Sequence, residues 1–202
     1  NIMPIKALDA SGRGDEDKLG EAIRYAVDHG AKIVVLSVGL TRDDPFLREV
    51  VQYAEQKGVL LVAATGNDEG RNVRYPAAYP TVLAVGGVLS GNKPADRSNY
   101  GPELDIVAPW SVYTTALDGK YEYEEGTSMA APQVAAVAAM IWSRYPWLKP
   151  YQIRNWIRQT AEDIDVPGWD IRTGYGLLRA DRAMTQPYRE DMFEPNDTPA
   201  EA

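Results

Sequence analysis

The sequence predicts an α/β fold, a three-layer sandwich with a mainly parallel sheet. Residues 33–38, 59–64 and 82–88 form short, almost continuous apolar runs, which are typical of strands covered on both faces. Segments with a helical pattern alternate with these runs, as expected when helices connect parallel strands. The 202 residues, 45% of them hydrophobic, are sufficient for one domain with a sizeable core.

The first half of the chain supplies most of the predicted sheet. Its elements in order are a short apolar strand over 2–8, a glycine-containing loop over 10–13, an amphipathic helix over about 15–28, a strand over 33–38, a helix over 45–57 and strands over 59–64 and 82–88. The helix at 15–28 opens with acidic residues, which complement the positive end of its dipole.

The second half begins with an edge strand predicted over 104–107. From Ser128 the chain is apolar almost all round, which predicts a helix buried within the domain, and Pro132 fits only the first turn of such a helix. A further helix is expected from Pro150 to about Thr160. Residues 188–202 are polar and rich in proline, so we expect a domain over 1–187 followed by a linker.

Composition excludes several classes of partner and site. The formal net charge is −8, whereas nucleic acids and anionic membranes require a surplus of Lys and Arg, so neither is an expected partner. The chain has no cysteine and hence no disulfide or thiolate catalyst, and no apolar run approaches the length of a bilayer span. Because the first residue is Asn1 and no signal peptide follows, we expect an internal piece of a longer product, with the N-terminal part of the fold missing.

The segment Glu125-Gly-Thr-Ser-Met-Ala-Ala-Pro132 places Ser128 between a glycine turn and the start of the Ala-rich helix. A serine hydroxyl acts as a nucleophile only beside a general base and donors for the developing oxyanion. The helix start offers unpaired N–H groups, and Asn67, after an apolar strand and Gly66, could offer a second donor. Taken singly, Ser128 could be a helix N-cap and Asn67 a turn residue.

Together these motifs resemble those of the subtilisin-like serine peptidases. The resemblance is carried by residues 126–132 and 63–67 and by the segments 75–86 and 98–109, and it covers nearly the full length. It implies a subtilisin-like fold and a serine endopeptidase that forms an acyl-enzyme on Ser128. It also implies an oxyanion hole made by Asn67 and the Ser128 backbone N–H.

The family's catalytic order is Asp, His, Ser, and only the serine portion matches this chain. The one histidine, His29, reads as the last turn of a helix capped by Gly30 and does not match the family's histidine motif, so it is not the expected base. We therefore expect a companion N-terminal fragment that carries Asp and His. The alternatives are a catalytically silent peptide-binding fragment or pseudopeptidase, and an esterase or acyl transferase with the same nucleophile.

The resemblance also implies a cleft for a polypeptide substrate, bound as an added strand. The backbone segments expected on its two sides are Ser37, Val38 and Gly39 and Gly12, Arg13 and Gly14, and the expected lining of the primary specificity pocket is Ala64 and Gly66 with Arg74 at its base. Arg74 would favour an acidic or small side chain before the scissile bond. Pairing of Arg74 with Asp68, or its solvation, is an equally weighted alternative.

Two further expectations come from the resemblance. A site for calcium or a monovalent cation would use the backbone carbonyls of Ala77, Tyr79 and Val82 with the carboxylates of Glu103 and Asp105. Residues 193–199 resemble the opening of a C-terminal domain of secreted bacterial peptidases, which implies a secreted, extracellular protein. The acidic run Glu122, Glu124 and Glu125 before the serine motif reads as a solvated charge run.

Overall fold

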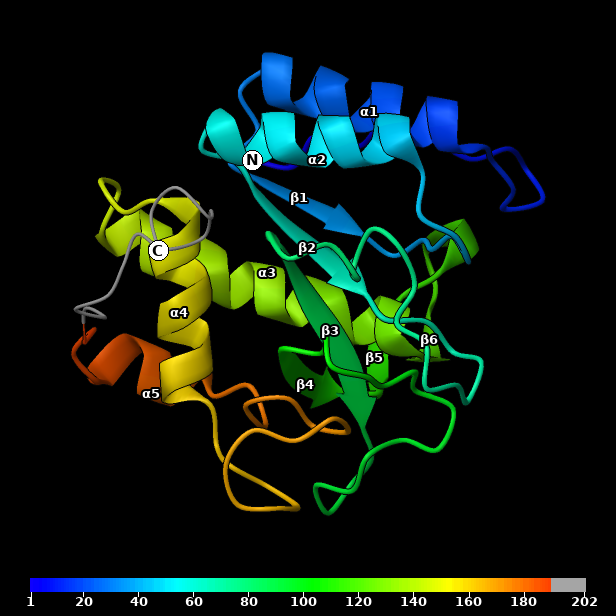
Figure 1. The fold of residues 1–202 in the computed structure, drawn as a ribbon. Coiled ribbons are helices and arrows are strands. Elements are labelled where there is room, and N and C mark those ends of the chain that lie inside the picture. Colours follow the sequence, from blue (N-terminus) through cyan, green and yellow to red (C-terminus); the bar gives the residue numbers. More distant parts are fainter. Residues whose placement is uncertain (190–202) are drawn as a thin grey trace.

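The computed structural model describes residues 1–189, and at their centre lies a four-stranded parallel sheet (Figure 1). Its strands, in spatial order, are β1 (Ile33–Leu36), β2 (Leu60–Ala64), β3 (Val82–Val88) and β4 (Ile106–Pro109). All three neighbouring pairs are parallel, so the carboxyl ends of the strands meet at one edge of the sheet. Ligand sites of open α/β sheets lie at that edge.

Helices cover both faces of the sheet (Figure 1). One face is covered by α1 (Glu16–Asp28) and α2 (Pro45–Gln56), the other by α3 (Thr127–Arg144), α4 (Pro150–Thr160) and α5 (Ala180–Thr185). Strand β2 serves both layers, because Leu60 and Val62 pack in the cluster with α3 and α4, while Leu61 and Ala63 pack in the cluster with α1 and α2. The predicted three-layer sandwich is confirmed.

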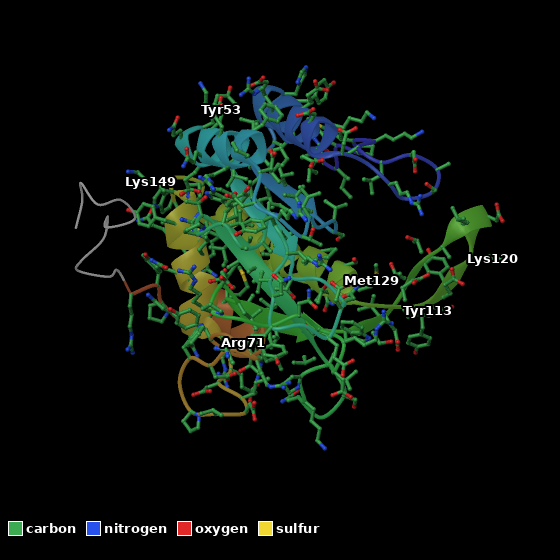
Figure 2. All side chains as sticks on the ribbon, turned by 45° about the vertical axis from the view of Figure 1, so that its right-hand side comes forward. Tyr53, Arg71, Tyr113, Lys120, Met129 and Lys149 are labelled. Atoms are coloured by element: carbon green, nitrogen blue, oxygen red, sulfur yellow. The ribbon has the colours of Figure 1, made fainter. Side chains whose placement is uncertain are left out.

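A two-stranded antiparallel hairpin stands apart from this sandwich. It consists of β5 (Ser111–Thr115) and β6 (Tyr121–Glu125), joined by the short 3₁₀ turn η1 (Leu117–Gly119). Figure 2 shows it projecting from the body of the protein, with Lys120 near its tip. Strand β6 runs directly into Gly126 and the start of α3, so the hairpin is covalently continuous with the serine motif.

The predicted helices and central strands are confirmed, with side-chain caps at two helix starts. Asp15 accepts a hydrogen bond from the Lys18 amide at the start of α1, and Asp44 accepts one from the Leu47 amide at the start of α2. β4 lies at the sheet edge as predicted but begins two residues late, because the Leu104 amide donates to the Gly101 carbonyl in a turn.

The strand predicted over 2–8 is wrong, because this segment has no strand beside it. Within residues 1–189, β1 pairs only with β2, and the chain before Leu8 has no regular structure. Its apolar side chains face solvent, with Ile2 94% and Met3 42% exposed. An apolar run becomes a strand only when a neighbour satisfies its backbone groups.

Of the predicted linker over 188–202, all but the first two residues lie outside the described part of the chain, as does the segment 193–199. Over residues 1–189, no helix combines the length and the apolar composition that crossing a bilayer demands.

Candidate active site

Ser128 is the second residue of α3, at the sheet edge where the parallel strands end. The helix is preceded by Gly126, whose φ of 137° lies in the region that side chains rarely adopt. A Cβ at Gly126 would stand 3.0 Å from Nδ2 of Asn67. Glycine is thus required for the turn and for the close approach of Asn67, and the structure brings the two predicted catalytic residues together.

Thr127 fixes the orientation of the Asn67 amide. Asn67 Oδ1 accepts hydrogen bonds from the Thr127 backbone N–H at 3.0 Å and from the Thr127 hydroxyl at 2.7 Å. The same hydroxyl accepts from the Gly66 N–H at 3.2 Å, and Thr127 is fully buried. With Oδ1 held as the acceptor, Nδ2 is left as the donor that faces the serine turn.

The Ser128 backbone N–H is a second available donor. It lies in the first turn of α3, where amides have no intrahelical acceptor, and among residues 1–189 it makes no hydrogen bond. The positive end of the helix dipole adds to this donor. Asn67 Nδ2 and the Ser128 amide thus form a pair of donors suited to an oxyanion beside the Ser128 hydroxyl.

Pro132 lies in the second turn of α3, as its sixth residue, and not in the first turn as predicted. Proline has no N–H, so it cannot donate to the carbonyl of Ser128 four residues earlier. The hydroxyl of Ser37 makes this bond instead, at 2.9 Å. The residue that follows β1 is therefore tied to the backbone of Ser128, which makes the proline tolerable at this position.

The predicted specificity pocket gathers around Arg74. A Cβ at Gly39 would lie 2.8 Å from Cβ of Arg74, and one at Gly66 would lie 2.7 Å from Cγ of Arg74. The Arg74 side chain, 19% exposed, thus lies against both glycines, and Ala64 is buried at the end of β2. Arg74 pairs with Asp68 at 2.7 Å, and its hydrogen bond lowers the pKa of Asp68. The structure therefore contains the Arg74–Asp68 ion pair, which is one of the two alternatives predicted for Arg74.

Asn99 organises the loop that follows Asn67, and sequence reasoning gave it no role. It is 1% exposed, and its Oδ1 accepts from the amides of Asp68 at 2.8 Å and Gly70 at 3.3 Å. Its Nδ2 donates to the Asn72 carbonyl at 3.0 Å. Thr127 was likewise without an assigned role. The available signal was their position, since Thr127 lies within the serine motif and Asn99 within the segment 98–109.

The two predicted sides of the substrate cleft are placed differently. Ser37, Val38 and Gly39 follow β1 at the edge of the sheet where Ser128 lies. Gly12, Arg13 and Gly14 lie in an exposed loop before α1, where Asp9 Oδ1 accepts from the Arg13 amide at 3.0 Å. Figure 1 shows this loop extending beyond the N-terminal start of α1. No hydrogen bond between described residues joins it to residues 37–39, so a strand bound between the two segments stays a prediction.

Four of the five predicted cation ligands line a cavity of about 370 Å³. These four residues are Tyr79, Val82, Glu103 and Asp105. The fifth, Ala77, is buried and lies two residues before Tyr79 in the sequence. Asp105 is already engaged, because Oδ2 accepts from the Ala84 amide at 2.7 Å and Oδ1 from Arg158 at 2.8 Å. Burial raises the pKa of Asp105, and the neighbouring Arg158 opposes this rise.

These contacts suit a divalent ion poorly. The guanidinium of Arg158 already neutralises Asp105, which leaves Glu103 as the other carboxylate of the set. Residues 1–189 contain no group of three His, Cys, Asp or Glu side chains placed to share a metal. The cation site stays a prediction.

His29 does not approach Ser128. It caps the end of α1, its Nδ1 lies 2.8 Å from the Tyr25 carbonyl, and its ring stacks on Tyr25 at 3.9 Å between centroids. It precedes β1 and therefore lies at the amino end of the sheet, opposite the serine. His29 is the one histidine in the sequence, and a base supplied by a companion segment stays a prediction.

Comparison with known proteins places this geometry in a family. Residues 1–176 match the model of the subtilase family. The thermostable alkaline protease of Halalkalibacterium halodurans is 39% identical over 184 residues, which cover 91% of this chain and 50% of the relative. The minor extracellular protease Epr of Bacillus subtilis is 38% identical over 180 residues, which cover 88% of this chain and 28% of that protein.

A solved lanthipeptide protease shares the fold, with a TM-score of 0.83 and 28% identity over 90% of this chain and 70% of that one. The chain thus spans half or less of the two curated relatives and most of the solved structure. The family match and the paired serine and asparagine motifs agree, and the chain belongs to the subtilase family.

Proposed function

We propose that this chain is the serine-bearing part of a serine endopeptidase, which cleaves peptide bonds through an acyl-enzyme on Ser128. The observation that carries the proposal is the double hydrogen bond from Thr127 to Asn67 Oδ1, because it leaves Nδ2 as a donor beside the nucleophile. The free Ser128 amide supplies the second donor of the oxyanion hole.

In the proposed reaction, the Ser128 oxygen attacks the carbonyl carbon of the scissile peptide while the base takes the hydroxyl proton. Negative charge then develops on the carbonyl oxygen, where Asn67 Nδ2–H and the Ser128 N–H stabilise it. Collapse of this intermediate breaks the C–N bond, and the base returns the proton to the leaving amine. Water repeats the sequence on the acyl-enzyme, which releases the acid and restores Ser128.

The proposal requires a companion segment that carries the family's Asp and His. The free edge of β1 is a suitable place for it, because within the described residues β1 is an edge strand and its Val35 is 40% exposed. A second exposed apolar side chain, that of Ile5 at 36%, lies in the irregular segment before α1. A further parallel strand on this edge would cover apolar surface and satisfy the backbone groups of β1.

For specificity, we propose that a small, neutral side chain precedes the scissile bond. Gly66 and Ala64 keep the pocket wall free of bulk, and Asp68 neutralises Arg74, which removes most of the preference for an acidic substrate. We also propose that the protein is secreted, in keeping with the name of the Bacillus subtilis relative, an extracellular protease.

The test is to produce the chain with and without its upstream segment and to assay both on an unfolded protein and on a simple ester. We expect hydrolysis of the protein only with the upstream segment, and intact-mass analysis should find that fragment with the chain. Ser128→Ala is the control and should abolish activity. Peptide binding without any Ser128-dependent hydrolysis would instead identify a silent binding module, and turnover of the ester alone an esterase.

A further inference from the structure

The β5–β6 hairpin carries an aromatic surface that the proposed reaction does not use. Tyr113 pairs with Tyr123 across the hairpin, and Tyr121 lies two residues from Tyr123 along β6, so the three rings share one face. Their exposed fractions are 63%, 74% and 60%. The centroid of the Tyr113 ring lies 5.2 Å from that of Tyr123 and 6.0 Å from that of Tyr121.

These rings, here called the tyrosine face, lie on an arm that projects into solvent, and Figure 2 shows Tyr113 on it. Every residue of β6 is exposed, so the arm shields none of its own side chains in a core. Clustered aromatic side chains that a folded protein leaves uncovered indicate a binding surface. Tyrosine adds large contact area at little cost in conformational entropy.

The charge of the hairpin indicates what the tyrosine face binds. Between residues 111 and 125 the chain has four carboxylates, on Asp118, Glu122, Glu124 and Glu125, and one cation, Lys120. None of the four carboxylates forms an ion pair with another residue in the described part of the chain. The faces of tyrosine rings attract ammonium and guanidinium groups. Because side chains alternate along β6, Glu125 lies on the tyrosine face, whereas Glu122 and Glu124 lie on the opposite face and add to the negative potential around the hairpin.

The tyrosine face lies close enough to the nucleophile to hold the same polypeptide. A strand rises about 3.3 Å per residue, so Tyr123 lies about 10 Å and Tyr121 about 17 Å along the chain before Gly126. The outer edge of β6 is unpaired within residues 1–189, so an extended peptide can also add its backbone there. A substrate can therefore reach the tyrosine face with residues that lie well away from its scissile bond.

We propose that the tyrosine face is a docking surface for a lysine- or arginine-bearing segment of the polypeptide substrate, held roughly 10–20 Å from Ser128. That the bound polypeptide is also the substrate rests on the proposed function. The binding itself requires only the hairpin and takes place without catalysis.

The test measures binding alone, with a Ser128→Ala variant of the chain so that no peptide is cut. Three short fluorescent peptides are compared by anisotropy: one alternates Ala with Arg, and the others have Gln or Glu in place of Arg. We expect the Arg peptide to bind at least about fivefold more tightly than the Gln peptide, and the Glu peptide more weakly still. Added salt should weaken binding of the Arg peptide.

Substitutions then locate the bound peptide. Tyr113→Ala with Tyr123→Ala should weaken binding of the Arg peptide at least about fivefold, since each exposed cation–π contact adds a modest increment. Glu122→Gln with Glu124→Gln should reduce the effect of salt and leave the rings in place. Tyr25→Ala is the matched control, because Tyr25 is 51% exposed on α1, away from the hairpin, and this variant should bind as before.

Equal affinity for the Arg and Gln peptides would overturn the proposal, as would unchanged binding in the double tyrosine variant. Self-association of the chain that disappears with the same two substitutions would also overturn it, since the tyrosine face would then bind a second copy. Failure of the proposed peptidase activity is seen separately, in hydrolysis by the unsubstituted protein with its upstream segment.

Discussion

Thr127→Val tests whether one buried hydroxyl holds the oxyanion hole together. Valine keeps the shape of threonine but removes the hydroxyl that donates to Asn67 Oδ1 and accepts from the Gly66 amide. Two hydrogen bonds are lost, and their partners, Asn67 Oδ1 and the Gly66 amide, stay partly buried. Each lost bond costs about 1 kcal/mol of stability. We expect the free energy of unfolding to fall by about 2 kcal/mol.

The same substitution should affect catalysis more than binding. Asn67 Oδ1 keeps only its bond from the Thr127 backbone amide, so the side-chain amide can rotate and Nδ2 is no longer held toward the oxyanion. Loss of one oxyanion donor lowers kcat by about 100- to 1000-fold, a magnitude known from subtilisin itself and carried over by homology. We expect a smaller loss for Thr127→Val, about tenfold in kcat with little change in KM, because the donor is loosened and not removed.

The assay is urea unfolding of the chain together with kcat and KM of the protein assembled with its upstream segment. Thr127→Ser is the matched control, since it keeps the hydroxyl, and should stay close to the unsubstituted protein in both measurements. If the valine variant unfolds within about 0.5 kcal/mol of the unsubstituted protein and keeps its kcat, the hydroxyl does not organise the site and the reasoning is refuted.

The remaining predictions concern two ion pairs. Asp68→Asn should raise cleavage after Glu relative to cleavage after Ala, because it removes the carboxylate that neutralises Arg74. A charge pair in water contributes about 1 kcal/mol, so the expected increase in this ratio is about fivefold. An unchanged ratio in peptide profiling would contradict this. The lowered pKa of Asp68 means that its contribution to stability is present above its ordinary pKa and is lost as the pH falls through the folded value, so acid titration of unfolding should differ between this variant and the unsubstituted protein. Glu55→Ala should destabilise the fold by about 3 kcal/mol in urea, because it strips a bidentate carboxylate from the buried guanidinium of Arg154. Glu49→Ala, which removes an exposed ion pair from the same helix, is its control and should cost less than about 1 kcal/mol.

Local patterns in the sequence were sufficient for the central sheet and for helices α1 to α4, whereas α5 and the β5–β6 hairpin were not predicted. The run 82–88 became β3 without any shift, because both faces of the strand are buried and every residue in it had to be apolar or small. The acidic start at Asp15 became a helix cap. The strand predicted over 2–8 failed because pairing depends on a neighbour, which no local pattern specifies.

The candidate site was predictable in its residue types and less so in its contacts. The motifs pointed to Ser128 and Asn67. The hydrogen bond from Thr127 to Asn67, however, joins residues 60 positions apart in the sequence, and the bond from Ser37 to the Ser128 carbonyl joins residues 91 positions apart. Such contacts follow from the packing of α3 against the strand ends. The choice between a free and a paired Arg74 likewise depended on the path of the loop that places Asp68.

The central claim, that Ser128 is an activated nucleophile once its base is supplied, is tested most directly by labelling with a fluorophosphonate followed by peptide mapping. The chain assembled with its upstream segment should carry one adduct, on Ser128, and the Ser128→Ala variant should carry none. Folded, assembled protein that stays unlabelled, or that carries the adduct on another residue, would contradict the claim.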